Sequence, residues 1–172
     1  ITTAILIIAP AVFFFACDFG NLPAGKRLLA SVFQSVTTRT AGFNTEDLSL
    51  MTEAGKAVMI LLMLIGGSPS STAGGMKTTT FAVLILNALA TFRSREDAGA
   101  FGRRFDGQVV KNAATIAMMY FMLFFFGGIT ISVYEGLPLL TCLYEAASAV
   151  GTVGLTLGIT PELHIISRLI LI

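Results

Sequence analysis

Long uncharged apolar runs dominate this chain, and their lengths predict membrane-spanning helices. A helix needs about 20 apolar residues to cross a hydrocarbon layer of roughly 30 Å. Residues 1–17 and 112–134 contain no charged side chain, and the second run lies between Lys111 and Glu135. The pattern predicts that both runs are simple spans. We expect the chain to be part of a longer protein, because it starts within a hydrophobic element.

A third apolar stretch, residues 53–92, is interrupted at its centre and predicts a discontinuous helix. Residues 57–76 and 78–92 are uncharged and are separated by Lys77 alone. From Gly66 to Gly75 the sequence reads GGSPSSTAGG, and glycine and proline weaken or break a helix. A kink packed through small residues is the alternative, but ten consecutive small or helix-breaking residues exceed what a kink requires.

Two shorter apolar segments, 28–37 and 137–149, suit half-length re-entrant helices because they are too short to span a bilayer. Each is followed by a tract of small residues that contains Thr-x-Gly, in residues 38–44 and 150–156. A shift of 112 positions superposes Thr-Ala-Gly-Phe of the first tract on Thr-Val-Gly-Leu of the second. The order of span, short helix, tract and second helix therefore occurs twice, and the last helix is predicted from residue 161.

Both tracts have the composition expected of a cation filter built from backbone carbonyls. Carbonyl oxygens replace the hydration shell of an ion without adding a fixed charge, and glycine lets them turn towards a pore. Thr-Val-Gly also begins the potassium-channel filter. A turn that caps a membrane helix is the alternative for either tract alone, and the recurrence favours a filter. The expected ligands of K⁺ are the backbone carbonyls of Thr40, Ala41, Gly42, Phe43, Thr152, Val153, Gly154 and Leu155.

The composition agrees with lipid as the main solvent. Hydrophobic residues make up 55% of the 172 positions and charged residues 12%, about half the charged share of a soluble domain. The formal net charge of +1 does not favour nucleic acid as a partner. Cys17 and Cys142 lie far apart in apolar surroundings, so neither a disulfide framework nor a cysteine metal site is predicted.

The segment 93–111 concentrates basic residues, which are typical of cytoplasmic loops. We therefore predict that it faces the cytoplasm. Its basic residues are Arg93, Arg95, Arg103, Arg104 and Lys111, against the acidic Glu96, Asp97 and Asp106.

Three further charged residues interrupt apolar surroundings and are candidates for function. Lys77 is expected either at a gate or at the inner membrane interface, where its side chain would reach water. Arg39 precedes Thr40 directly and is predicted to hold the filter backbone through carbonyl or carboxylate contacts. Glu145, in the second short helix, is predicted to do the same. An outer aqueous mouth is the alternative position for Arg39 and Glu145.

Residues 34–44, which read QSVTTRTAGFN, and residues 66–80 together resemble the Trk/Ktr/HKT superfamily of potassium transporters, and Ktr-type membrane subunits in particular. In that family four repeats of helix, pore loop and helix surround one pore. The resemblance implies an all-α integral membrane fold with re-entrant half-helices and a discontinuous helix. Residues 1–92 would be the third repeat, and residues 112–172 most of the fourth.

The resemblance also implies how the complete protein works. K⁺ is the expected transported ion, Na⁺ stays open as a second one, and no organic cofactor is expected. The complete subunit is expected in a bacterial cell membrane, as a homodimer that binds a cytosolic nucleotide-binding ring. Residues 66–76 are expected to contain a gating loop. The gate residues would be Gly66, Gly67, Ser68, Pro69, Ser70, Ser71, Thr72, Ala73, Gly74, Gly75 and Lys77.

Other classes of protein fit the residues less well. A secondary symporter for another small solute also uses broken helices and a midplane site, but the repeats here run in the same order. No enzyme is predicted, because the sequence has a single histidine and neither a nucleophile elbow nor paired carboxylates. A phosphate loop is excluded because Met76 separates Gly75 from Lys77.

Overall fold

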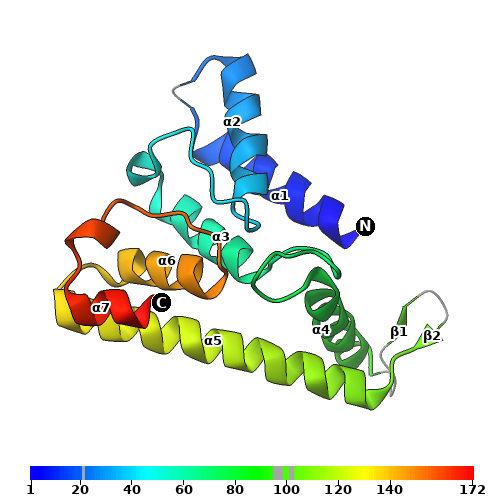
Figure 1. The fold of residues 1–172 in the computed structure, drawn as a ribbon. Coiled ribbons are helices and arrows are strands. Elements are labelled where there is room, and N and C mark those ends of the chain that lie inside the picture. The colour runs from blue at the N-terminus through cyan, green and yellow to red at the C-terminus, as the bar shows by residue number, and fades with distance from the viewer. Residues whose placement is uncertain (21, 95–98, 101–102) are drawn as a thin grey trace.

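The computed structural model describes residues 1–20, 22–94, 99–100 and 103–172, whose regular structure is almost entirely helical (Figure 1). Two strands of two residues each are the exception within these ranges. In chain order the elements are α1 (Thr2–Cys17), α2 (Ala24–Thr37), η1 (Leu48–Leu50), α3 (Glu53–Leu64), α4 (Thr78–Phe92), β1 (Gly99–Ala100), β2 (Arg103–Arg104), α5 (Gly107–Glu135), α6 (Leu139–Val150), η2 (Thr160–Glu162) and α7 (Ile165–Ile170).

The longest helix, α5, runs along one side of the molecule (Figure 1). Helices α6 and α7 lie beside its C-terminal part, and α4 meets its N-terminal part. Among the described helices it alone is long and apolar enough to cross a membrane. It begins five residues before the predicted start at 112, because the Asp106 carboxylate accepts a hydrogen bond from the Gln108 N–H (3.1 Å) and caps the helix.

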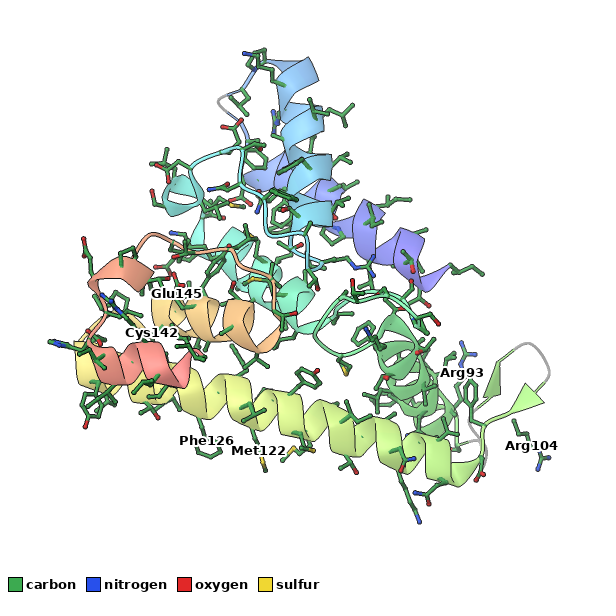
Figure 2. The ribbon with its side chains drawn as sticks, viewed as in Figure 1. Arg93, Arg104, Met122, Phe126, Cys142 and Glu145 are labelled. Atoms are coloured by element: carbon green, nitrogen blue, oxygen red, sulfur yellow. The ribbon has the colours of Figure 1, made fainter. Side chains whose placement is uncertain are left out.

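The exposed apolar side chains of α5 form a surface suited to lipid or to another chain. Leu123 and Phe126 are 61% and 64% exposed. Figure 2 labels Met122 and Phe126 on α5, and both side chains also line a groove with Ala149 of α6 and Ile170 of α7. A helix with large apolar groups on its outer side is expected in a membrane rather than in water.

The two half-length helices start at different residues than predicted. Helix α2 begins at Ala24, four residues early, because Pro23 has the extended backbone of a residue that precedes a helix. Helix α6 begins at Leu139, two residues late. Gly136 ends α5 in the left-handed conformation, and Pro138 then takes the position before α6.

The apolar stretch 53–92 forms two helices, α3 and α4, with an interruption at residues 65–77. Three backbone hydrogen bonds close the base of this interruption. Gly66 N–H donates to the Met76 carbonyl (2.9 Å), Met76 N–H to the Leu64 carbonyl (2.9 Å) and Thr78 N–H to the Gly67 carbonyl (3.2 Å). The chain therefore leaves α3, forms a loop and returns almost to the same point before α4 begins.

The last predicted helix begins later than residue 161. The chain first forms the single turn η2, and α7 starts at Ile165. The Glu135 carboxylate explains this start, since it accepts hydrogen bonds from the His164 N–H (2.9 Å) and from the Ser167 hydroxyl in the first turn of α7. The prediction missed a helix boundary that is set by a residue far away in the sequence.

The connection from α4 to α5 is shorter than the predicted loop 93–111, since residues 107–111 already belong to α5. Strands β1 and β2 pair antiparallel within it. Residues 95–98 and 101–102, which include Arg95, Glu96 and Asp97 of the predicted basic segment, lie outside the described residues.

The two repeats share one hydrophobic core, in which α1, α3 and α6 meet. Phe14 of α1, Met59 and Met63 of α3, and Tyr144 of α6 are all fully buried there. Val153, from the tract that follows α6, belongs to the same cluster and is 5% exposed. Burial of these side chains places the end of α3 and the second tract next to each other.

Candidate ion pathway

The first tract (residues 38–44) leaves the end of α2 in a conformation held by that helix. The N–H groups of Ala41 and Gly42 both donate to the Thr37 carbonyl (3.1 Å each), and the Thr37 hydroxyl donates to the Phe43 carbonyl (2.6 Å). Thr40 and Gly42 have φ angles of +69° and +73°. Left-handed residues on both sides of Ala41 turn successive N–H groups towards the helix, and the carbonyls are left for other partners.

The second tract (residues 150–156) repeats this arrangement at the end of α6. Thr152 N–H donates to the Ala149 carbonyl (2.9 Å), and Val153 N–H to the Ser148 carbonyl (2.8 Å). Thr152 and Gly154 have φ angles of +51° and +89°. The same two positions are therefore left-handed in both tracts, although a threonine adopts this conformation only at an energetic cost.

Several carbonyl oxygens of both tracts have no hydrogen-bond donor among the described residues. Within the described part of the chain, no hydrogen bond is directed to the carbonyls of Ala41, Gly42, Val153 or Gly154. The tracts also touch, because a Cβ atom placed on Gly42 would overlap the Val153 carbonyl oxygen. Glycine is required at position 42 both for its backbone conformation and for this close approach.

The interruption between α3 and α4 lies against the second tract. A Cβ atom on Gly74 would overlap the Thr152 hydroxyl and would lie 2.8 Å from the Gly151 carbonyl. A Cβ atom on Gly66 would likewise overlap the Gly74 carbonyl, so the loop is folded tightly on itself. The structure thus brings together three segments that are far apart in the sequence.

Comparison with known proteins gives a match over the complete chain. Residues 1–172 match the TrkH family, described as cation transport proteins. The chain belongs to the TrkH family. Since this is a transporter family, the chain is part of a membrane protein, and the all-helical character predicted from the sequence is confirmed apart from the two short strands.

Several curated relatives of this TrkH chain are named for potassium uptake. The Ktr system potassium uptake protein B of Bacillus subtilis is 38% identical over 153 residues, which cover 89% of this chain and 34% of the relative. The potassium/sodium uptake protein NtpJ of Enterococcus hirae is 37% identical over 179 residues, covering 99% and 40%. The Ktr system potassium uptake protein B of Vibrio alginolyticus is 33% identical, covering 95% and 37%.

These relatives confirm the resemblance to Ktr-type proteins that the sequence motifs indicated. The chain spans between about a third and two fifths of their length. The relatives therefore contain further sequence that this chain does not match.

Lys77 of the TrkH chain forms hydrogen bonds with backbone carbonyls of the interruption. It precedes α4, and its ammonium group donates to the carbonyls of Ser71 (3.0 Å) and Ala73 (2.5 Å). Ser70, next to the first acceptor, has a left-handed φ of +68°. The side chain of Lys77, at the end of the loop, thus stabilises the conformation of the middle of the loop.

Arg39 binds a backbone carbonyl outside both tracts. Its Nη2 donates to the Gly66 carbonyl (3.1 Å), at the base of the interruption. The sequence predicted carbonyl or carboxylate contacts that hold the filter backbone, and that supporting role stays a prediction. The long side chain crosses from the first tract to the loop, which a pattern of local residues could not indicate.

Glu145 of α6, labelled in Figure 2, binds the end of the second tract and the residues that follow it. It is 4% exposed and accepts hydrogen bonds from the Leu157 N–H (2.9 Å) and from the hydroxyls of Thr156 (2.7 Å) and Thr160 (2.8 Å). A buried carboxylate requires such partners. Its charge also lies beside a cavity that Thr152 and Gly154 help to line.

Sequence reasoning missed three residues of this arrangement. Thr156 and Thr160 hold the carboxylate of Glu145, and their spacing of four residues after a Thr-x-Gly tract was the available signal. Gly151 was missed as well. A Cβ atom there would overlap the Met63 carbonyl of α3, and only packing in three dimensions reveals that requirement.

Proposed function

We propose that this chain forms the third and fourth pore repeats of a potassium uptake protein, with both tracts contributing backbone carbonyls to one selectivity filter. The observation that carries the proposal is the pair of contacting tracts with left-handed threonine and glycine at matching positions. Fixed carbonyl dipoles without fixed charge suit a dehydrated K⁺ ion. The names of the relatives agree with this substrate, and NtpJ adds Na⁺ as a second ion to be tested.

Ion flux through the complete protein tests the proposal. The protein is reconstituted in liposomes, and uptake of ⁸⁶Rb⁺ is measured against competing K⁺, Na⁺ and an organic solute. Competition by K⁺ alone supports a potassium filter. Uptake of the solute that depends on an ion gradient would instead favour the symporter alternative.

The interruption is proposed to be the gate of this pathway. Gly74 lies against the second tract, so the loop occupies space directly beside the proposed carbonyls. Backbone that is not helical at membrane depth is tolerated where it lines a cavity or is buried in protein. Tethering by Lys77 and Arg39 holds this loop closed.

We expect Glu145→Ala to impair the filter more than Glu145→Gln. Alanine leaves the Leu157 N–H and two hydroxyls without their acceptor, which costs about 1–3 kcal/mol for a buried group. Glutamine keeps an acceptor oxygen. The expected result is a loss of K⁺ over Na⁺ preference in Glu145→Ala, with most of the preference retained in Glu145→Gln.

Glu135→Ala is the control, because Glu135 also accepts hydrogen bonds through its carboxylate, two instead of three, but at the start of α7 instead of at a tract. Its K⁺ preference should stay unchanged. Equal selectivity in Glu145→Ala and the unmodified protein would remove Glu145 from the filter.

The complete subunit is proposed to form a homodimer in a bacterial cell membrane and to bind a cytosolic nucleotide-binding ring. The basic connection between α4 and α5 is the proposed docking surface for the ring, and anionic lipid headgroups are the alternative partner of the same charges. Substitution of Arg103 and Arg104, which form β2, by glutamate distinguishes binding of the ring from binding of lipid headgroups.

Loss of co-purification with the ring, at normal membrane insertion, is the expected result for this double variant. Lys26→Glu, a charge reversal on the distant helix α2, serves as the control. Full retention of the ring by the double variant would exclude this connection from the interface.

A further inference from the structure

Matching positions of the two tracts carry different residues just before the left-handed threonine. In the first tract this position is Arg39, and in the second it is Gly151. Both approach the same segment of chain. Gly151 packs on the Met63 carbonyl in α3, and Arg39 donates to the Gly66 carbonyl just after α3 ends. The two tracts thus differ from each other at the position that approaches the interruption.

The acceptor of Arg39 lies at the point where the interruption closes. Gly66 also donates its N–H to the Met76 carbonyl and lies against Gly74. A displacement of the loop must therefore move Gly66 or strain its contacts. Any such movement changes the partner available to Arg39.

The Arg39 side chain is incompletely satisfied. It is half-buried, and its Nε is buried without a hydrogen-bond partner within the described residues. A buried donor without an acceptor costs free energy. Among the described residues, the Gly66 carbonyl is the one hydrogen-bond acceptor of the Arg39 guanidinium, and Thr40, the next residue, adopts its left-handed conformation beside it.

We propose that Arg39 is a positioning residue that couples the interruption to the first tract, so that displacement of the loop changes the conformation of Thr40 and its neighbours. The meaning of this coupling for transport rests on the proposed function. The contact itself can be tested without measuring transport.

Hydrogen exchange of the complete protein in detergent or nanodiscs tests the contact. Arg39→Gln removes the charged donor, and exchange of the peptide that covers residues 64–78 should become about tenfold faster, as expected for the loss of one charge-assisted hydrogen bond. Arg39→Lys, which keeps a charged donor, should give a smaller increase. This variant also decides the question if Arg39→Gln does not fold.

Arg27→Gln is the control, because Arg27 lies on α2, the helix that precedes the first tract, but donates to the Phe15 carbonyl (2.6 Å) at the end of α1. It should leave exchange in residues 64–78 unchanged. Unaltered exchange of this peptide in both Arg39 variants would overturn the proposal. Faster exchange confined to residues 37–44 would overturn it as well, since Arg39 would then stabilise its own tract only.

A double-variant comparison tests the consequence for flux. Arg39→Gln should raise ⁸⁶Rb⁺ flux about threefold in the full-length background, on the reasoning that a loosened loop opens more often. In a protein that lacks Ser68 to Gly74 it should give no further increase. An equal increase in both backgrounds would overturn the coupling. Absence of flux in the unmodified protein would contradict the proposed function and leave the exchange result valid.

Discussion

Gly42→Ala is expected to abolish discrimination between K⁺ and Na⁺ in the complete protein, and Gly154→Ser to weaken it. Both glycines have positive φ angles, +73° and +89°, where a side chain costs about 1–2 kcal/mol. Gly42 carries a second requirement, because a Cβ atom would overlap the Val153 carbonyl oxygen of the other tract. No atom lies within 4 Å of a Cβ placed on Gly154.

Gly154→Ser therefore tests backbone strain alone, whereas Gly42→Ala adds a steric overlap with the Val153 carbonyl. Strain alone corresponds to roughly a tenfold change in an equilibrium between filter conformations, and Gly42→Ala should exceed this. Competition of Na⁺ and K⁺ with ⁸⁶Rb⁺ uptake in liposomes measures the preference. Gly25→Ala is the control, since Gly25 lies on α2 with open space around it. Unaltered K⁺ preference in both tract variants would contradict the filter proposal.

The fold features that rest on local sequence could be predicted, and those that rest on distant contacts could not. The glycines and Pro69 between α3 and α4 indicated an interruption because they act on their own backbone. The start of α7 was predicted four residues early, because Glu135 determines it from another helix. Uncharged runs located α5 but missed its first turn, which a polar cap extends.

The candidate site shows the same division. Repetition of Thr-x-Gly indicated two equivalent tracts, and that pattern is visible in one dimension. Arg39 binds a carbonyl, one of the two kinds of acceptor predicted, but the identity of that carbonyl, Gly66, depends on the fold of the interruption. Glu145 does bond to the end of the second tract, yet the hydroxyls of Thr156 and Thr160 that hold it were missed, although their spacing was a signal. Whether these residues select an ion stays a prediction.

Removal of the loop should have a large effect on flux because of how its two ends are joined. The backbone hydrogen bonds donated by Gly66 to Met76 and by Met76 to Leu64 already hold the ends of the interruption together. Deleting Ser68 to Gly74 shortens the loop without requiring α3 and α4 to move apart. The deletion removes Gly74 from its contact with Thr152 and removes both carbonyls that Lys77 binds.

Protein without Ser68 to Gly74 is therefore expected to conduct severalfold faster than the unmodified protein, with K⁺ preference largely intact. The constriction is lost, but the carbonyls of both tracts are unchanged. Lys77→Gln provides a graded comparison, because it frees the Ser71 and Ala73 carbonyls and keeps the loop. Its flux should lie between the other two. The measurement is the initial rate of ⁸⁶Rb⁺ uptake per folded, inserted protein. Equal flux in all three proteins would refute the gate. Higher flux with lost selectivity would show that the loop instead supports the filter.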